Sequence, residues 1–330
     1  MKKILSSIMA AALICTMTAC GNNEKNNIIS EETNNDKLSI VCTIFPEYDW
    51  VRELTSGSDN TEITLLLDNG VDLHSFQPTA DDIIKISTCD MFIYVGGESD
   101  GWVEDALKSA TNKDMNVINL LDVLGDGVKE EEIKEGMEHD HDHEENGEHH
   151  EHEYDEHIWL SLRNADSVCK YISEKLGKTD PENKPLYDSN YAAYSEKLNA
   201  LDKRYSDTVS AGTKKTILFG DRFPFRYLTD DYGLDYYAAF AGCSAETEAS
   251  FETIAFLASK VDELGLDCIM TIEGKEHKIA ETIAQNTSSG SKNILTFDSM
   301  QGTTSEDANS GTTYLSVMES NLAVLKEALD

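Results

Sequence analysis

The sequence predicts an α/β protein made of two lobes, each with a four-stranded, mainly parallel sheet flanked by helices. Three observations predict this class. Short apolar runs rich in β-branched residues recur along the chain, and a polar turn and a helical pattern follow each of them. Parallel sheets that helices cover on both faces have this pattern. Four of the runs precede residue 121 and four follow residue 215, and one long segment of helical periodicity separates the two sets.

The amino terminus has the pattern of a secretory signal. A basic start precedes an apolar run over residues 4–17, which is too short for a comfortable membrane span and ends in small residues before Cys20. We expect a signal peptide over residues 1–19 and lipidation of the Cys20 thiol; an ordinary signal peptide that happens to contain this cysteine is the alternative. Two acyl chains would anchor the protein to the outer face of a membrane. The polar residues 20–36 are expected to form a flexible tether.

The two lobes are expected over residues 37–180 and 213–330. The strands of the first lobe are predicted over residues 38–44, 62–67, 90–95 and 115–120. The strands of the second lobe are predicted over residues 216–219, 234–240, 266–272 and 293–297.

A long helix is predicted over residues 181–212, between the lobes. Pro185 stands near its start and Gly212 at its end. Its apolar residues recur at steps of three and four and therefore form one stripe. They are Tyr191, Tyr194, Leu198, Leu201, Tyr205 and Val209. Such a helix either packs on one lobe or bridges both as a stiff spine.

The segment 125–156 interrupts the α/β pattern. It contains almost no apolar residue and is rich in acids and histidines. Such a stretch cannot bury enough surface to offset its ordering entropy, so we expect a mobile loop inserted in the first lobe. Its histidines suit transition metals, which the loop should bind weakly and at several places. They are His139, His141, His143, His149, His150 and His152.

The overall charge favours cations as partners. The chain has a formal net charge of −35, which argues against binding to nucleic acid or anionic lipid. The cysteines after Cys20 stand far apart and form no C-x-x-C pair, so we expect buried free thiols rather than a disulfide framework. A Cys243–Cys268 disulfide is an alternative that no pattern supports.

Two histidines stand in ordered surroundings. His74 lies in a loop between a predicted strand and a predicted helix, at the carboxyl end of a strand where open α/β sheets bind ligands. His157 lies where the acidic segment ends, directly before the apolar residues 158–160, so it should be fixed in space. Because histidine binds zinc and similar ions, both are candidate metal ligands.

The second lobe offers carboxylates in equivalent places. Asp221 follows the predicted strand 216–219, and Asp298 follows 293–297. An aspartate after a strand can form a turn or cap a helix. It can also complete a metal site, and both interpretations stay open here. Glu273 and His277 are weaker candidates. The H-E-x-x-H spacing of zinc proteases fails at both His143 and His152, so we expect no hydrolase.

Several segments together resemble one known family. They are DLHSFQPTADDI, DMFIYVGGESDGWVEDAL, DEHIWLSLRNA, FRYLTDDYGL and TFDSMQ. The chain resembles, from Leu38 to Leu329, the zinc- and manganese-binding lipoproteins of bacterial ABC importers, the cluster A-I binding proteins. The acidic, histidine-rich segment before the second histidine is typical of the zinc members.

The resemblance implies two lobes joined by a long rigid helix, with one metal ion in the cleft. Matching the motifs gives His74 and His157 as ligands from the first lobe and Asp298 from the second. The remaining family ligand is usually His in zinc members and Glu in manganese members. This sequence has neither, so Asp221, water or a histidine of the acidic segment is expected to fill the place.

The expected function is therefore that of an extracytoplasmic, lipid-anchored solute-binding protein rather than an enzyme. It would capture a divalent metal ion, foremost Zn²⁺ with Mn²⁺ as the alternative, and deliver it to an ABC permease and its ATPase. The acidic loop would raise the local metal concentration. Two alternatives stay open: an extracellular zinc-buffering adhesin without a permease, and a metalloenzyme, which would need an open coordination position and a general base.

Overall fold

The computed structural model describes residues 37–138, 154–244, 248–274 and 276–330. The expected signal peptide, the lipidation site Cys20, the tether and the six loop histidines all lie outside these ranges. Within these ranges, no helix is both long enough and apolar enough to cross a membrane.

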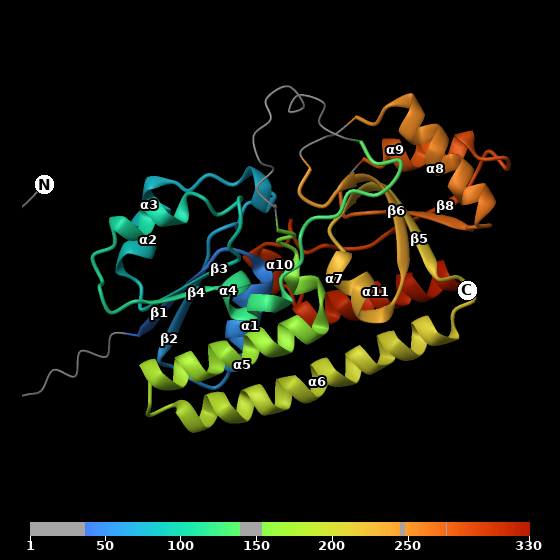
Figure 1. Cartoon of the computed structure of the whole chain (residues 1–330). Helices are drawn as coiled ribbons and strands as arrows, with labels where there is room; N and C mark the ends of the chain where they lie inside the picture. The colour runs from blue at the N-terminus through green and yellow to red at the C-terminus, as the bar shows by residue number, and fades with distance from the viewer. Residues whose placement is uncertain (1–36, 139–153, 245–247, 275) are drawn as a thin grey trace, which may run out of the picture. The chain divides into compact units, whose positions relative to one another are not determined.

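The first lobe contains a four-stranded sheet in the order β2-β1-β3-β4, and all neighbouring strands are parallel (Figure 1). Its strands are β1 (Leu38–Cys42), β2 (Thr61–Leu65), β3 (Met91–Tyr94) and β4 (Asn116–Asn119). Each begins within one residue of its prediction. The accompanying helices are α1 (Phe45–Leu54), α2 (Ala80–Thr88), α3 (Val103–Lys108), α4 (Leu120–Leu124) and α5 (Leu162–Thr179).

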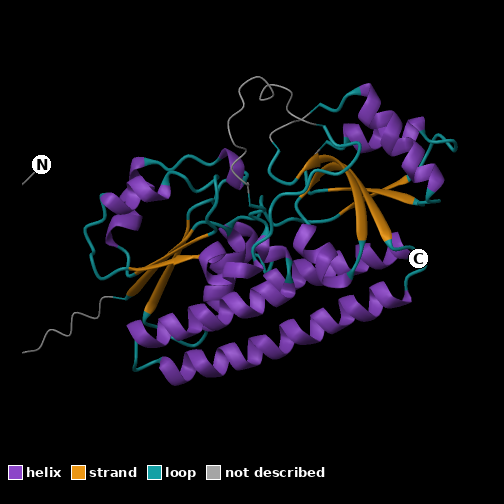
Figure 2. Ribbon diagram, in the orientation of Figure 1, coloured by secondary structure: helices purple, strands orange, loops and turns teal. Residues whose placement is uncertain are grey.

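The second lobe repeats this arrangement, with parallel strands in the order β6-β5-β7-β8. The strands are β5 (Thr216–Phe223), β6 (Asp235–Ala241), β7 (Cys268–Thr271) and β8 (Asn293–Thr296). The helices are α7 (Arg226–Tyr232), α8 (Phe251–Glu263), α9 (Lys278–Asn286), α10 (Ser305–Asn309) and α11 (Tyr314–Leu329). Figure 2 shows the two separate sheets with helices around them. The predicted fold class is confirmed.

Burial explains why these runs form parallel sheets. Met91, Phe92 and Ile93 of β3 are fully buried, as are Ile269 and Met270 of β7. Consecutive residues of a strand point to opposite faces, so both faces of each sheet must be covered. The continuous apolar runs of the sequence therefore indicate strands that helices cover on both faces of the sheet.

Strand β5 is four residues longer than predicted. Its polar residues 220–222 suggested a loop, but pairing with β6 resumes at Arg222 and Phe223 after an irregularity that begins at Phe219. A bulge of this kind redirects side chains near a strand end. Asp221 therefore lies inside a strand rather than after one.

Helix α6 (Lys184–Ala211) joins the two lobes. Its 28 residues span about 42 Å. It contacts α1 and α5 in the first lobe and α7 and α11 in the second, so the bridging interpretation is confirmed. Five residues of the predicted stripe are buried, and Tyr191 is partly buried against the same core. The Tyr205 hydroxyl donates to the Met318 carbonyl of α11 at 2.6 Å.

Residues 128–138 form a docked segment, here called the stem, within the stretch expected to be a mobile loop. Lys134 pairs with Asp235 and lies 4.1 Å from the centre of the Tyr236 ring. The Glu138 amide donates to the Ala239 carbonyl at 2.9 Å, and Met137 is 4% exposed. The stem thus packs on β6 of the second lobe. Ion pairs and one apolar anchor provide contacts that composition alone does not reveal.

Candidate metal centre

The local fold fixes the backbone of His74. This residue lies in a short 3-10 helix (Leu73–Ser75) after β2, where the sequence placed it. The Asp72 carboxylate caps this turn and accepts from the His74 amide at 2.9 Å. Leu73 is buried and anchors the turn, while Thr79 begins α2 with a capping box. His74 is therefore held at the carboxyl end of the first sheet.

His157 is completely buried at the start of another 3-10 helix (Ile158–Leu160), whose three apolar residues are also fully buried. The chain then enters α5, where Ser161 is the capping residue and accepts from the Asn164 amide at 3.1 Å. The chain is thus well ordered directly after the acidic segment, as expected. His157 is fixed by its own buried neighbours.

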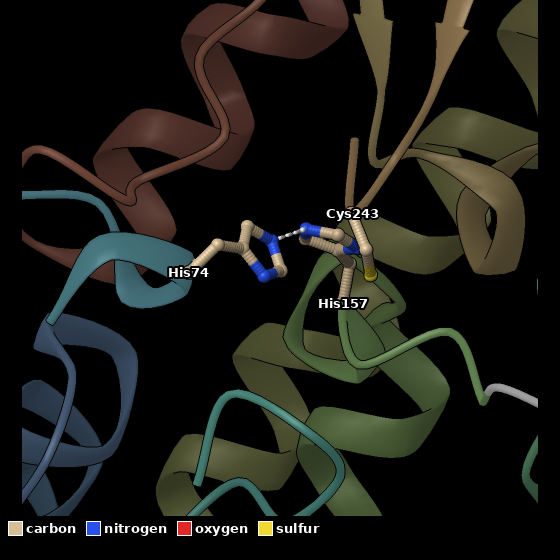
Figure 3. A group of neighbouring side chains, drawn as sticks. All are labelled: His74, His157 and Cys243. Carbon is tan, nitrogen blue, oxygen red and sulfur yellow. Dashed lines mark hydrogen bonds between the residues drawn. The ribbon is translucent and has the colours of Figure 1, made fainter. Parts of the chain in front are cut away.

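The two imidazoles face each other. His74 Nε2 lies 3.1 Å from His157 Nε2 (Figure 3). The other ring nitrogens have partners: His74 Nδ1 lies 2.7 Å from Ser99 Oγ, and His157 Nδ1 lies 3.1 Å from Asp155 Oδ1. A histidine that donates through Nδ1 to an oxygen presents the Nε2 lone pair to a metal ion. Each Nδ1 has an oxygen partner that fits this arrangement once a metal ion replaces the hydrogen bond between the two Nε2 atoms.

Electrostatics keep His74 neutral. Burial, then the charge that a protonated His157 would carry, lower the pKa of His74 to about 3, although Asp72 opposes the shift. Metal binding requires a neutral imidazole. At neutral pH, His74 therefore offers its lone pair without first losing a proton.

The spacing of the two nitrogens fits a zinc ion. Zinc binds histidine nitrogen at about 2.0–2.1 Å with tetrahedral angles, which separates two such nitrogens by roughly 3.3 Å. The 3.1 Å separation is close to that value. A small movement of either ring would accommodate the ion.

A third donor lies beside the histidines. Cys243 Sγ and one ring nitrogen of each histidine all lie within 4.8 Å of one another. Among the described residues, no other group of three such side chains meets this criterion. The sequence suggested only a buried thiol at Cys243, because nothing in its spacing connects it with the histidines. The structure gives it a free thiol in a loop just after β6.

The carboxylates expected as ligands do not belong to this group. Asp221 accepts from the amides of Arg222 and Ile272, at 2.9 and 3.3 Å. Asp298 accepts from the Met300 amide at 2.7 Å. Burial and then Glu273 raise the pKa of Asp298 to about 6, and burial raises the pKa of Asp221.

The two weaker candidates also have other partners. Glu273 accepts from the Ser299 amide and hydroxyl, each at 2.6 Å. His277 Nδ1 lies 3.0 Å from Thr271 Oγ1. Neither residue belongs to the group around His74.

Arg222, rather than one of these carboxylates, contacts the turn that carries His74. Its guanidinium donates to Asp72 Oδ2 at 2.5 Å. Burial would raise the pKa of Asp72, but Arg222 and His74 together lower it. In the sequence, this arginine directly follows Asp221, in the stretch where the resemblance places the His or Glu ligand of the family. The positive charge fixes Asp72, which in turn caps the turn of His74.

Two α/β lobes, each with a parallel sheet, and a pair of facing histidines are the features of a two-lobed solute-binding protein with a candidate metal site. The model of the family described as zinc-uptake complex component A, periplasmic, matches residues 40–328. The chain belongs to this family. Its members are substrate-binding components of transport systems rather than enzymes.

Named relatives agree with this assignment. The zinc-binding lipoprotein AdcA of Streptococcus pneumoniae serotype 4 is 32% identical over 330 residues, which cover all of this chain and 62% of AdcA. The high-affinity zinc uptake system protein ZnuA of Bacillus subtilis is 31% identical over 329 residues, 99% of this chain and 98% of ZnuA. The Zn(II)-bound ZnuA-like domain of S. pneumoniae AdcA has a TM-score of 0.69 at 28% identity, over 89% of this chain and 99% of that domain.

Proposed function

We propose that this protein is an extracytoplasmic, lipid-anchored solute-binding protein that captures Zn²⁺ and delivers it to an ABC permease and its ATPase. His74 and His157 hold the ion through their Nε2 atoms. The single observation that carries this proposal is the 3.1 Å approach of these two nitrogens, each oriented by a partner at Nδ1. Membership of a zinc-uptake family and the zinc named in both relatives support the choice of metal.

Asp298 and Asp221 are secondary candidates for additional ligands of the ion. Asp298 and Asp221 come from the family resemblance, yet both accept backbone amides in this conformation. Neither carboxylate belongs to the group of donors around His74 among the described residues. Mn²⁺ is the alternative cargo, and such added carboxylates would favour it, because manganese prefers oxygen ligands.

The histidine-rich segment would serve as an auxiliary collector. Its six histidines lie outside the described residues, and the proposal for them rests on sequence alone. Replacing all six with asparagine should leave the tight site intact but reduce zinc uptake when zinc is scarce. Unchanged uptake at limiting zinc would remove this role.

A competitive Zn²⁺ titration of the full chain tests the central site. Wild type should show one tight site above several weak ones, and His74→Ala and His157→Ala should each weaken it by about 100-fold or more, since each removes a direct ligand. His277→Ala is the matched control, because this histidine lies outside the group. A tight site that survives both ligand substitutions would refute the proposal.

Transport separates this function from the alternative of an extracellular zinc buffer or adhesin. A strain that lacks the protein should grow poorly at limiting zinc and recover with wild type but not with His74→Ala. Equal zinc uptake with and without the protein would favour the buffer or adhesin.

A further inference from the structure

We propose that the Cys243 thiolate is the third protein ligand of the metal, so that the loaded site contains two imidazoles and one sulfur. This inference rests on the proposed function, because His74 and His157 must bind the ion for Cys243 to complete it. Its basis is the group itself: Sγ and a nitrogen of each ring lie within 4.8 Å of one another (Figure 3). A tetrahedral zinc ion would separate sulfur from nitrogen by roughly 3.5 Å, so a small movement closes the site.

The stem holds the backbone of Cys243 in place. The Cys243 amide donates to Glu131 Oε1 at 2.9 Å. The preceding residue, Gly242, passes so close to His157 that a Cβ atom there would lie 3.1 Å from Cε1 of the ring. This close approach brings the loop after β6 against the buried histidine. The backbone that carries the thiol is therefore held from two sides.

Arg222 connects the cysteine loop with the turn of His74. Its guanidinium donates to Asp72 at 2.5 Å and lies 3.5 Å from the Ser244 carbonyl, one residue beyond Cys243. Asp72 also accepts from the His74 amide. One arginine thus bridges the segments that carry two of the three donors. An arginine cannot itself bind a metal cation, whereas Cys243, on the loop that Arg222 contacts, offers a donor atom.

The chemistry of a thiolate fits zinc. When the ion binds, a zinc–sulfur bond forms, the S–H bond breaks, and the proton leaves to solvent. Sulfur is a soft ligand that favours zinc and disfavours manganese, which prefers oxygen. Cys243 would therefore give the site selectivity for zinc without the carboxylates that manganese would need.

Cobalt substitution and zinc X-ray absorption test the assignment directly. One equivalent of Co²⁺ bound to wild type should produce a sulfur-to-cobalt charge-transfer absorption, and the zinc-loaded protein should show a scatterer at about 2.3 Å. Cys243→Ser should lose both signals and bind zinc about 100-fold more weakly. Cys268→Ala, which removes a buried thiol of β7, should retain both signals.

Thiol protection provides a measurement that needs no variant. Burial raises the pKa of the Cys243 thiol, so prolonged alkylation of the metal-free wild-type protein at alkaline pH should modify Cys243 slowly, and one equivalent of zinc should prevent this. Zinc bound tightly through His74 and His157, with neither a sulfur scatterer nor protection of Cys243, would overturn this inference while leaving the proposed function intact. If tight zinc binding were lost only when residues other than His74, His157 and Cys243 are substituted, both this inference and the proposed function would be overturned.

Discussion

Asp155 orients His157 through two contacts. Its Oδ1 accepts from the His157 amide at 2.9 Å and lies 3.1 Å from Nδ1 of the same ring. Both groups are buried, with Asp155 at 2% exposure. The carboxylate thus selects the tautomer that leaves Nε2 free for the metal.

Asp155→Asn should weaken zinc binding by about 10- to 100-fold, because the amide holds the ring less firmly and supplies no negative charge. A competitive titration would measure the change. Asp114→Asn, an exposed substitution in the same lobe, should leave the affinity unchanged. Equal affinities for wild type and Asp155→Asn would show that the ring needs no such partner.

Glu47 gives the protein an unusual dependence of stability on pH. Burial, and then the nearby Asp100, raise the pKa of Glu47 to about 8. The folded state therefore keeps a proton that the unfolded chain loses at lower pH. Its contribution to stability is fully present below the unfolded pKa and is lost as the pH rises towards 8.

The free energy of unfolding should fall between about pH 5 and pH 8, with a contribution from Glu47 on the order of 3–5 kcal/mol. Glu47→Gln keeps an acceptor for the amides of Thr43 and Ile44 and should flatten this decline. Urea unfolding at several pH values would measure it. The exposed Glu62→Gln should retain the wild-type slope, and a slope equally steep in Glu47→Gln would contradict the assignment.

For single residues, the sequence selected the two histidines that the structure brings together, but not Cys243, which lies beside them. His74 and His157 could be selected because each stood beside a recognisable strand, cap or apolar cluster. Cys243 could not, since its approach depends on the Glu131 contact and the loop after β6. Asp221 looked like a loop residue only because the bulge in β5 was not visible in the apolar pattern.

Among the elements, helix α6 has the largest structural role. Its buried stripe packs against helices of both lobes, so it links their stabilities. Periodicity predicted this stripe correctly because a helix that buries one face must repeat its apolar residues. The docking of the stem escaped prediction, since charged side chains make many of its contacts.

Leu198→Ala should lower the free energy of unfolding by about 2–4 kcal/mol, since it leaves a cavity at a residue that is 1% exposed. Chemical denaturation would measure the loss. Glu196→Ala, on the exposed face of the same helix, should change stability by less than about 0.5 kcal/mol. Similar effects from both substitutions would argue against the bridging role of the stripe.

For the whole molecule, contacts between the lobes surround the metal centre. The Trp159 indole donates to the Ser299 carbonyl at 2.9 Å, and the Tyr227 hydroxyl donates to the Asp155 carbonyl at 2.8 Å. Together with α6, these contacts link the two lobes, so we expect metal release to require small loop movements rather than wide opening. The two-lobed α/β class could be predicted because apolar runs and a long stripe determine it, whereas the extension of β5 and the docking of the stem could not.

Bound zinc should stabilise the folded protein. At a free concentration of about 100 times Kd, the gain in the free energy of unfolding should be about 2.7 kcal/mol. Denaturation with and without zinc would measure it. His277→Ala should keep the gain and His74→Ala should lose it, whereas an equal gain in both would indicate that other groups bind the metal.

Crystallographic anomalous scattering at the zinc edge would show whether His74 and His157 hold the ion. Crystals of the zinc-loaded protein should show one strong peak between His74 Nε2 and His157 Nε2, at about 2.0–2.1 Å from each. A strong peak elsewhere, with these two nitrogens still in contact with each other, would show that the two histidines do not bind the ion.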